Sequence, residues 1–427
     1  MILAVGLRKW NGIMTDYIPL EKLYYRESSS DPEATTLSAA EKRLKDTSTF
    51  RTGIEIKAGE LFLAVPKELT SLNDRLLRVE RKVSLLWHEL PGIAHGAYLR
   101  GLIFDEIVST NEIEGIRSTR RQIQESLAGA APKHDTSPQK RFREFAKLYL
   151  ELTDKNHVYP QTPADLRKIY EAVVAGELEE NQQPDGELFR KEGADVLDST
   201  QKVIHRGVTP ESAIKKMLGQ MIALADSSDI PPTFAAIITH FLFEYIHPFY
   251  DGNGRMGRYL LALYLSGPLS LPTALSLSKV IAENKSKYYK AFKAAEAPRN
   301  YGEITFFVIQ MMEFISLAQD DVIANLEKKK GLLQKAEEAL PGLKKAPLFL
   351  TDKETKIMFL AVQNFLFGAI TETSLQDISQ YSGSGLQTAR KYVSRLEDKG
   401  LLQSLSLRPL TFALTAKAFM AFGLTED

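Results

Sequence analysis

The stretch His247-Pro248-Phe249-Tyr250-Asp251-Gly252-Asn253-Gly254-Arg255-Met256-Gly257-Arg258 lies between two strongly apolar segments and decides how the centre of the chain folds. The apolar run from Thr233 to about Ile246 predicts a helix, which Pro248 ends because proline disfavours helical backbone in the residue before it. Gly252 and Gly254 allow the backbone to turn sharply. A second apolar helix is therefore expected from about Arg255 to Ser266.

The side chains of this loop are typical of phosphoryl or nucleotidyl transfer. His247 is a candidate general base at neutral pH, and Asp251 is an oxygen ligand suited to Mg²⁺. Free N–H groups at the start of the second helix form an anion site, and Arg255 and Arg258 share one face of its first turn. The sequence contains no GxxxxGK[ST] segment, so this phosphate site is not a P-loop.

The same loop resembles the signature of the Fic family, HPFx(D/E)GN(G/K)RxxR, at every specified position. Fic proteins are mostly helical and transfer AMP from ATP to Ser, Thr or Tyr hydroxyls of proteins. Gly254 stands where the phosphorylating Doc-type branch has Lys, which favours AMP transfer. The resemblance covers roughly residues 99–317.

The resemblance implies a role for each residue of the loop. His247 is expected to take the proton from the target hydroxyl, and Asp251 to hold Mg²⁺ against the α- and β-phosphates of ATP. Phe249 is expected to anchor the loop in the core. Asn253 and the backbone of Gly252 and Gly254 are expected to form an anion hole for the phosphates. Arg255 is expected to bind the phosphates as well, and Arg258 to bind the γ-phosphate.

Upstream, Thr110-Asn111-Glu112-Ile113-Glu114-Gly115 resembles the inhibitory motif of the family, (S/T)xxxE(G/N). Thr110 and Glu114 share a helix face, and Gly115 suits the end of a helix. The resemblance implies that Glu114 pairs with Arg258 in place of the γ-phosphate, so that the enzyme is autoinhibited. Two alternatives stay open: inhibition across a homodimer, and removal of AMP from modified protein by the same site.

Two further segments match parts of the family. Phe189–Arg206 is expected to form an irregular hairpin, at the position where Fic proteins carry the flap that docks the target. An exposed strand edge there can pair with a target segment through main-chain hydrogen bonds. Asn284, Tyr288 and Tyr289 match the region that often lines the nucleobase pocket, although two adjacent tyrosines on a helix fit a core position equally well.

Composition excludes several other functions. Lys+Arg and Asp+Glu both total 54 in 427 residues, and this zero net charge disfavours a general nucleic-acid binder. The chain has no cysteine, which excludes disulfides, thiolate metal sites and cysteine nucleophiles. The first residues place an apolar run before a basic pair, the reverse of a secretory signal, and no stretch is suited to span a bilayer. We expect a cytoplasmic protein without membrane partners.

The order of the elements expected in the C-terminal region predicts a winged helix-turn-helix. Helices are expected at Asp352–Phe367, Ser374–Tyr381 and Leu386–Lys399, followed by two strands within Leu401–Leu414. The third helix offers Gln387, Thr388, Arg390 and Lys391 to bases or phosphates. Residues 351–427 carry eight basic and eight acidic side chains, which disfavours DNA binding. A DNA-binding regulator is nevertheless the alternative from another functional class.

The whole chain is expected to be mostly α-helical, with a Fic-type core, a small hairpin flap and the C-terminal winged helix. We expect an N-terminal region with the inhibitory helix at 1–130, the catalytic core at 131–320, a helical linker and hinge at 321–347 and the winged helix at 348–427. Periodicity predicts a hairpin at Gly53–Val65 and a hinge at Leu340–Pro347. Helices are expected at Leu69–His88, His95–Glu114, Ser137–Asn156, Pro163–Ala175, Pro210–Ala225, within Ser276–Ala297, and from Tyr301 to Leu340.

These expectations together describe a protein adenylyltransferase. Its substrates are ATP and a hydroxyl side chain of an unidentified target protein, which includes the enzyme itself as a candidate. Mg²⁺ is the expected cofactor.

Overall fold

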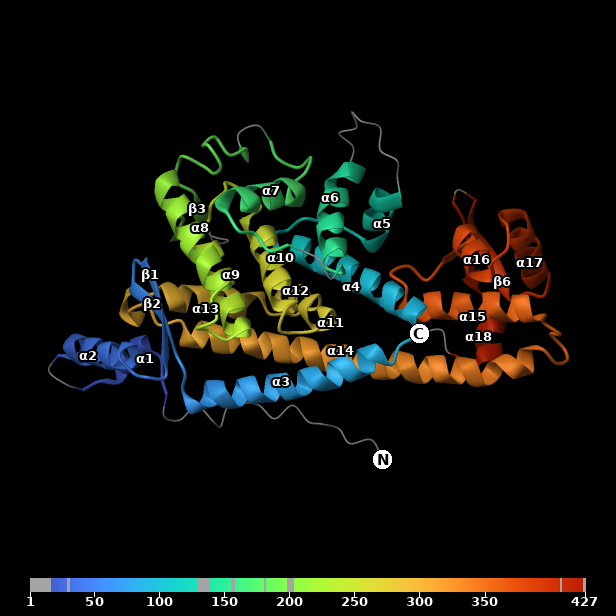
Figure 1. Ribbon diagram of the computed structural model, residues 1–427, viewed down its shortest axis with the longest axis horizontal. Coiled ribbons are helices and arrows are strands. Elements are labelled where there is room, and N and C mark those ends of the chain that lie inside the picture. Colours follow the sequence, from blue (N-terminus) through green and yellow to red (C-terminus); the bar gives the residue numbers. More distant parts are fainter. Residues whose placement is uncertain are drawn as a thin grey trace.

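The computed structural model describes residues 17–28, 31–128, 138–154, 158–179, 182–197, 203–407 and 409–424, and most of them are helical (Figure 1). The expected mostly α-helical fold is confirmed. Only small sheets accompany the helices in this part of the chain: two two-stranded hairpins and one sheet of three strands.

Two apolar helices form the centre of the large core, α9 (Pro232–Ile246) and α10 (Asn253–Leu265). Nearly all of their side chains are buried, which agrees with their continuous apolar sequence. The helices that cover α9 and α10 are α4 (Gly92–Ile113), α5 (Arg120–Ala128), α6 (Pro138–Glu151), α7 (Pro163–Val173) and α8 (Glu211–Ala225).

Two long helices lie side by side along one edge of the molecule, α3 (Lys67–His88) and α14 (Thr305–Leu343) (Figure 1). The sequence predicted a helix from Tyr301 that ends at Leu340, but α14 continues through Pro341 to Leu343. Pro341 lies in the last turn of α14. The predicted hinge is therefore partly helical.

The N-terminal part contains a predicted hairpin and two helices that the sequence did not predict. Strands β1 (Thr49–Ile56) and β2 (Gly59–Ala64) pair antiparallel, as expected for Gly53–Val65. Before them lie α1 (Leu20–Arg26) and α2 (Pro32–Leu44). The start of α2 carries recognisable signals, because Asp31 caps it and Pro32 occupies its first position.

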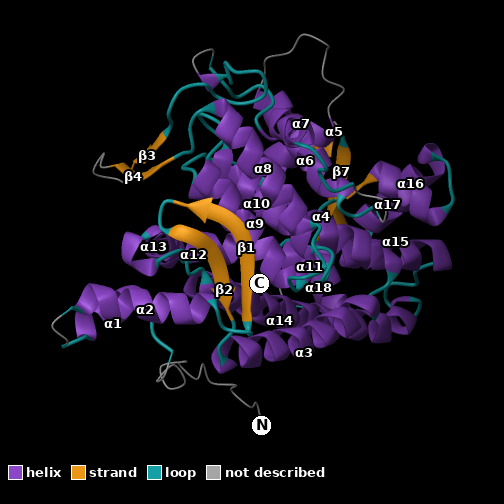
Figure 2. Ribbon diagram, turned by 60° about the vertical axis from the view of Figure 1, so that its left-hand side comes forward, coloured by secondary structure: helices purple, strands orange, loops and turns teal. Residues whose placement is uncertain are grey.

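The segment between α7 and α8 carries the predicted irregular hairpin. Strand β3 (Asp195–Leu197) pairs antiparallel with β4 (Val203–Arg206), and Figure 2 shows both at the periphery. Residues 198–202 lie outside the described part of the chain. After α10, three short helices lead to α14 by way of a 3-10 turn, and they are α11 (Leu271–Ala274), α12 (Leu277–Glu283) and α13 (Lys285–Glu296).

The C-terminal region follows the predicted order of three helices and two strands. They are α15 (Asp352–Phe367), α16 (Leu375–Ser382), α17 (Leu386–Asp398), β6 (Leu402–Leu407) and β7 (Leu410–Leu414). The sequence analysis missed β5 (Thr373–Ser374), which completes a sheet of order β5-β7-β6, and α18 (Ala416–Phe422). That this unit is a winged helix remains a prediction.

The C-terminal region shares a hydrophobic core with the rest of the chain. Val83 of α3, Tyr98 of α4 and Leu326 of α14 belong to the same buried cluster as Phe367 and Leu396. The region therefore packs against the far ends of the long helices instead of standing apart from them (Figure 1). Within the described ranges, no helix is both long and apolar enough to cross a bilayer.

Candidate active site

His247 lies at the end of α9 in a backbone conformation that is rare for its residue type. Its φ of 50° and ψ of 61° are left-handed, and this turns the chain out of the helix. Burial lowers the pKa of His247 to about 3, and His205 and Arg190 contribute in the same direction. The imidazole is therefore neutral at physiological pH, which is the state that accepts a proton.

Phe249 anchors the loop that follows His247. Its ring is fully buried and stacks on Tyr170, with 3.4 Å between ring centroids. The Asn253 amide closes the loop, because its Oδ1 accepts from the Phe249 N–H at 3.0 Å and its Nδ2 donates to the Phe249 carbonyl at 2.8 Å. Burying one phenylalanine side chain contributes about 1.5–3 kcal/mol. The Asn253 side chain thus shapes the loop from inside.

Arg190 is a fully buried arginine that holds the end of α9. Its Nε donates to the His247 carbonyl at 2.8 Å, and its Nη2 donates to the carbonyls of Val208 at 2.9 Å and Ile246 at 3.4 Å. Its own backbone N–H donates to the Pro248 carbonyl at 3.2 Å. The last carbonyls of a helix lack partners within the helix, so this guanidinium satisfies them and fixes the His247 backbone. The sequence analysis did not single out Arg190.

We expect Arg190→Met to destabilise the protein and to disturb His247. More than one buried carbonyl would lose its donor, and each such loss costs about 1–3 kcal/mol. The measurement is the free energy of unfolding in urea. The control is Arg206→Met on β4, whose side chain is 69% exposed and pairs with Asp195 at 3.5 Å. Equal stability of the two variants would contradict this role for Arg190.

Arg258 is buried and receives contacts from the end of α4. Its Nε donates to Thr110 Oγ1 at 2.7 Å, and its Nη2 donates to the Thr110 carbonyl at 3.2 Å and to Glu114 Oε1 at 2.6 Å. Burial is the largest effect on the pKa of Arg258 and would lower it, but Glu114, Tyr288 and Glu244 together outweigh burial and raise this pKa above its usual range. The ion pair that the sequence motif predicted is thus present in the structure.

The end of α4 positions Glu114 through backbone hydrogen bonds. The Gly115 N–H donates to the Glu112 carbonyl at 3.1 Å, and the Ile116 N–H donates to the Asn111 carbonyl at 2.9 Å. This pair of bonds is the Schellman ending of a helix, and Gly115 has the positive φ, 75°, that it requires. Lys285 Nζ donates to the same Glu112 carbonyl at 2.7 Å.

Gly254 is packed against the docked glutamate. A Cβ atom built at this position would collide with Glu114 Oε1, and it would lie 3.0 Å from Arg258 Nη1. A side chain at position 254 would therefore force the Glu114 carboxylate to shift from its observed position. The absence of a side chain at Gly254 thus leaves room for the Glu114 carboxylate in its observed position.

Glu244, on α9, is a second carboxyl group near Arg258. Its Oε1 is buried and has no hydrogen-bond partner among the described residues. Burial raises the pKa of Glu244 to about 8, although Arg258 opposes the shift. The Glu244 carboxyl is therefore largely protonated at neutral pH. The sequence offered no signal for this carboxyl inside an apolar helix.

One cavity of about 380 Å³ brings the candidate residues together. His247, Gly254 and Arg258 line it from the loop and α10, Glu114 lines it from α4, and Tyr288 and Tyr289 line it from α13. Other lining residues are Val196, His205, Glu244, Lys290, Phe292, Lys293 and Glu296. A neutral histidine and a buried arginine thus share one cavity with a strand of the hairpin flap.

The two tyrosines occupy different environments. Tyr288 is buried, and its hydroxyl is 2.7 Å from Nε2 of the buried His240. Tyr289 is 43% exposed, so its ring is the one available to a ligand. Asn284 joins α12 to α13, and its Nδ2 donates to the Val280 carbonyl at 2.9 Å. Asn284 is not among the residues that line the cavity.

Arg255 and Asp251 also lie outside the lining of this cavity. Arg255 is buried and pairs with Glu177, a carboxylate that the sequence analysis did not single out. Asp251 is exposed, and its Oδ1 accepts from the Gly252 N–H at 2.6 Å. The described residues contain no group of three side chains suited to hold a metal. A single carboxylate beside substrate phosphates is, however, a common way to bind Mg²⁺.

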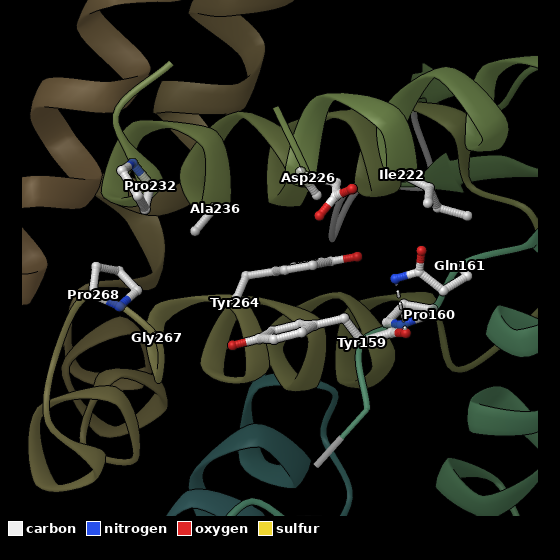
Figure 3. A pocket seen from close by; sticks show the side chains of 11 residues that line it. Tyr159, Pro160, Gln161, Ile222, Asp226, Pro232, Ala236, Tyr264, Gly267 and Pro268 are labelled. Atoms are coloured by element: carbon white, nitrogen blue, oxygen red, sulfur yellow. Dashed lines mark hydrogen bonds between the residues drawn. The ribbon is translucent and has the colours of Figure 1, made fainter. Parts of the chain in front are cut away.

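A separate cavity of about 280 Å³ lies between α8, α9 and the end of α10 (Figure 3). Its floor is the stacked pair Tyr159 and Tyr264, with ring centroids 5.7 Å apart. None of the predicted site residues lines it.

The predicted recognition helix corresponds to α17. Its four candidate contact residues are all exposed, and they are Gln387, Thr388, Arg390 and Lys391. DNA binding by this helix remains a prediction.

Comparisons with known proteins agree with the geometry of the site. Residues 160–265 match the model of the Fic/DOC family. Over 61 residues the chain is 46% identical to a probable protein adenylyltransferase of Aquifex aeolicus; this match spans 14% of the chain and 17% of the relative.

Solved Fic structures also resemble the chain. A Fic family protein from Desulfovibrio desulfuricans is 19% identical over 82% of this chain and 97% of that one, with a TM-score of 0.49. Fic-1 from C. elegans is 18% identical over 72% and 81%, with a TM-score of 0.45. The segment that matches the Fic/DOC family model includes the whole loop from His247 to Arg258.

Proposed function

We propose that this protein transfers AMP from ATP to a hydroxyl side chain of a target protein. The observation that carries the proposal is that the neutral His247 and the buried Arg258 line the same cavity, inside a loop that matches the Fic/DOC family. This arrangement supplies a base for the attacking hydroxyl and a cation for the phosphates of ATP. The name of the Aquifex relative supports the same activity.

The proposed step forms one bond and breaks one. The target hydroxyl oxygen attacks the α-phosphorus of ATP, and its proton passes to a ring nitrogen of His247. The bond from the α-phosphorus to the bridging oxygen breaks, and pyrophosphate leaves. His247 is held for this step by the Arg190 contact to its carbonyl, because a base must lie within hydrogen-bond reach of the proton that it abstracts.

The phosphates are proposed to meet the start of α10 and Arg258. Gly252 has a φ of 80°, which lets the backbone turn so that the first N–H groups of α10 face the loop. Arg258 would hold the γ-phosphate once Glu114 leaves it. Arg255 is proposed to bind the phosphates as well, although its guanidinium is paired with Glu177 in this structure.

Mg²⁺ is the proposed cofactor, with Asp251 as its protein ligand. When bound, this ion would neutralise charge on the phosphates of ATP. The exposed Asp251 carboxylate suits that role, because Mg²⁺ usually takes one or two carboxylates together with phosphate oxygens and water.

We expect Asp251→Ala to lose most AMP transfer and the Mg²⁺-dependent part of ATP binding. The measurements are the transfer rate and calorimetric ATP binding, each with and without EDTA. Asp229→Ala, which removes another exposed carboxylate of the same core, serves as the matched control. Transfer by the wild type that persists in EDTA would exclude Mg²⁺ from the reaction.

The flap is proposed to dock the target protein. Val196 of β3 lines the cavity and pairs with His205 of β4, so a target segment added to this edge would lie beside His247. Main-chain pairing would fix the segment and leave side-chain specificity broad.

The experiment that tests the reaction class is intact-mass analysis of the protein and of cell lysate after incubation with ATP and Mg²⁺. A mass increase of one AMP group is the expected result.

Removal of AMP is a second candidate, because Glu114 lines the same cavity as His247. A carboxylate there can activate a water molecule against an AMP-modified hydroxyl. Incubation of AMP-modified target with the wild type separates the two directions: release of free AMP supports removal, and a stable modification supports transfer alone.

A further inference from the structure

The cavity of about 280 Å³ in Figure 3 lies at the ends of α9 and α10 that are opposite the His247 loop. Pro232 lines it at the start of α9, and Tyr264 and Gly267 line it at the end of α10. At about 1.5 Å per residue, the 15 residues of α9 separate this cavity from His247 by about 20 Å. The loop from His247 to Arg258 contributes none of its lining residues, so it is a site apart from the proposed reaction.

The charges and dipoles around this cavity favour a positively charged ligand. Asp226 lines the cavity, and no basic side chain does so. Asp226 is the C-cap of α8, and Gly267 and Pro268 follow the last turn of α10, so two helices end here. The C-terminal end of a helix carries partial negative charge, which basic side chains in the last turn can offset. Neither α8 nor α10 has a basic residue in its last turn.

Two stacked aromatic rings supply a flat wall. The Tyr159 and Tyr264 rings are nearly parallel, with an angle of 9° between their planes. In Figure 3 the Tyr159 ring lies against one face of the Tyr264 ring, and Asp226 and Ala236 lie on the side of the opposite face. The face of an aromatic ring attracts cations, and a guanidinium stacks on it. A flat cation in the cavity can thus contact the Tyr264 ring and the Asp226 carboxylate together.

The Tyr264 hydroxyl is a buried polar group at the same wall. Tyr264 is only 9% exposed, yet its hydroxyl has no hydrogen-bond partner within the part of the chain that the structure describes. Burial raises the pKa of Tyr264, and Tyr159 and the negative charge of Asp226 add to the shift. A buried hydroxyl without a partner costs free energy, which a ligand in the cavity would recover. Gln161, whose Nε2 donates to the Tyr159 carbonyl at 3.4 Å, adds an amide oxygen.

We propose that this cavity binds a guanidinium group. A guanidinium is planar and always charged, and it carries several N–H donors. It can therefore stack on the Tyr264 ring while it donates to Asp226 and to the oxygens of Tyr264 and Gln161. Sites for drug-sized ligands have volumes of about 300–1,000 Å³, so this smaller cavity suits one arginine side chain or a small guanidinium compound.

The test is calorimetric titration of the full chain with Nα-acetylarginine amide and, separately, with methylguanidinium, at constant ionic strength. We expect saturable binding to the wild type. Nα-acetylcitrulline amide, in which a neutral urea replaces the guanidinium, should bind about ten-fold more weakly or worse, because it loses the charge-assisted contact with Asp226. Equal binding of the arginine and citrulline compounds would overturn the proposal. So would the absence of saturable binding of both guanidinium probes.

The two guanidinium probes separate the possible sources of the ligand. Saturation by methylguanidinium would show that the group alone suffices, as in a small guanidinium compound. Saturation by Nα-acetylarginine amide alone would show that the chain of an arginine residue is needed, as in a peptide. Either result supports a guanidinium site.

Asp226→Asn locates the binding in this cavity. Asp226 is exposed and asparagine has the same shape, so the fold should persist. The affinity for Nα-acetylarginine amide should fall about ten-fold or more, since the contact with a carboxylate is lost. The matched control is Asp229→Asn, which removes an exposed carboxylate that does not line the cavity. Equal binding by Asp226→Asn and the wild type would contradict the proposal.

Tyr264→Phe tests the hydroxyl while it keeps the stacked ring. We expect this variant to bind Nα-acetylarginine amide about five-fold more weakly, since one neutral hydrogen bond is lost. Its unfolding midpoint in urea should not fall, because the hydroxyl has no partner among the described residues. A lower midpoint with unchanged binding would show that the hydroxyl serves the fold instead of a ligand, and it would overturn the proposed site.

Discussion

Glu114→Gly should raise AMP transfer about ten-fold or more, including transfer onto the enzyme itself. In the structure Glu114 occupies Nη2 of Arg258, so the γ-phosphate of ATP cannot take that position. Without a contact between its γ-phosphate and Arg258, ATP would bind with its α-phosphate badly placed for in-line attack. Positioning can contribute ~7–11 kcal/mol to a barrier, so restoring even a small part of it gives a large gain in rate.

The same variant should respond more strongly to ATP in thermal stability. Arg258 has only 2% of its side chain exposed, and removing its partner leaves a buried charge uncompensated, which typically costs 3–5 kcal/mol. The γ-phosphate of ATP would supply a new partner. We therefore expect a lower Tm for Glu114→Gly without nucleotide and a larger rise in Tm with ATP than the wild type shows.

Two controls identify the contact that matters. Glu112→Gly changes an exposed side chain of the same helix end and should leave transfer unchanged. The double variant Glu114→Gly with Arg258→Ala should lose the gain, because the freed partner is absent. A catalytic glutamate would give slower transfer in Glu114→Gly, and a structural glutamate would give lower stability without faster transfer. Either result would contradict autoinhibition and leave the proposed reaction class untouched.

His247→Ala should abolish AMP transfer while ATP still binds. Loss of a positioned base typically reduces a rate by ~10²–10⁴-fold. The imidazole is neutral in this cavity and so can accept a proton, and the contacts proposed between Arg258 and the phosphates do not depend on it. The measurements are the transfer rate, made in the Glu114→Gly background for sensitivity, and calorimetric ATP binding.

A matched control for this variant is His88→Ala, at the exposed end of α3. That substitution should change neither rate nor binding. Undiminished labelling of a target by His247→Ala would show that another group takes the proton. Loss of ATP binding together with activity would show that the variant disturbs the loop instead of removing a base.

The sequence predicted those parts of the site whose signal is local. The loop from His247 to Arg258 combines helix-ending proline, turn glycines and charged residues within one short segment, and the structure has the helix, turn and helix that this order predicts. Glu114 was placed opposite Arg258 because its motif could be compared with a family, and not because anything near Glu114 indicates a partner 144 residues away.

The residues that the sequence analysis missed depend on contacts between distant segments. Arg190 is an ordinary arginine in a polar segment, and only the fold shows that it is buried beneath the His247 carbonyl. Glu244 interrupts an apolar helix, and its unpartnered oxygen becomes visible only when α9 and α10 pack together. Likewise, Pro341 suggested a break in a helix that continues for two more residues.

The most direct test of AMP transfer is a labelling experiment with two forms of ATP. The Glu114→Gly protein is incubated with Mg²⁺ and ATP that is radiolabelled at either the α- or the γ-phosphate. Both reactions are then denatured, and protein-bound label is counted. Transfer of AMP predicts label on protein from the α-labelled ATP and none from the γ-labelled ATP. Label from the γ-labelled ATP alone would show phosphoryl transfer and would contradict the proposed function.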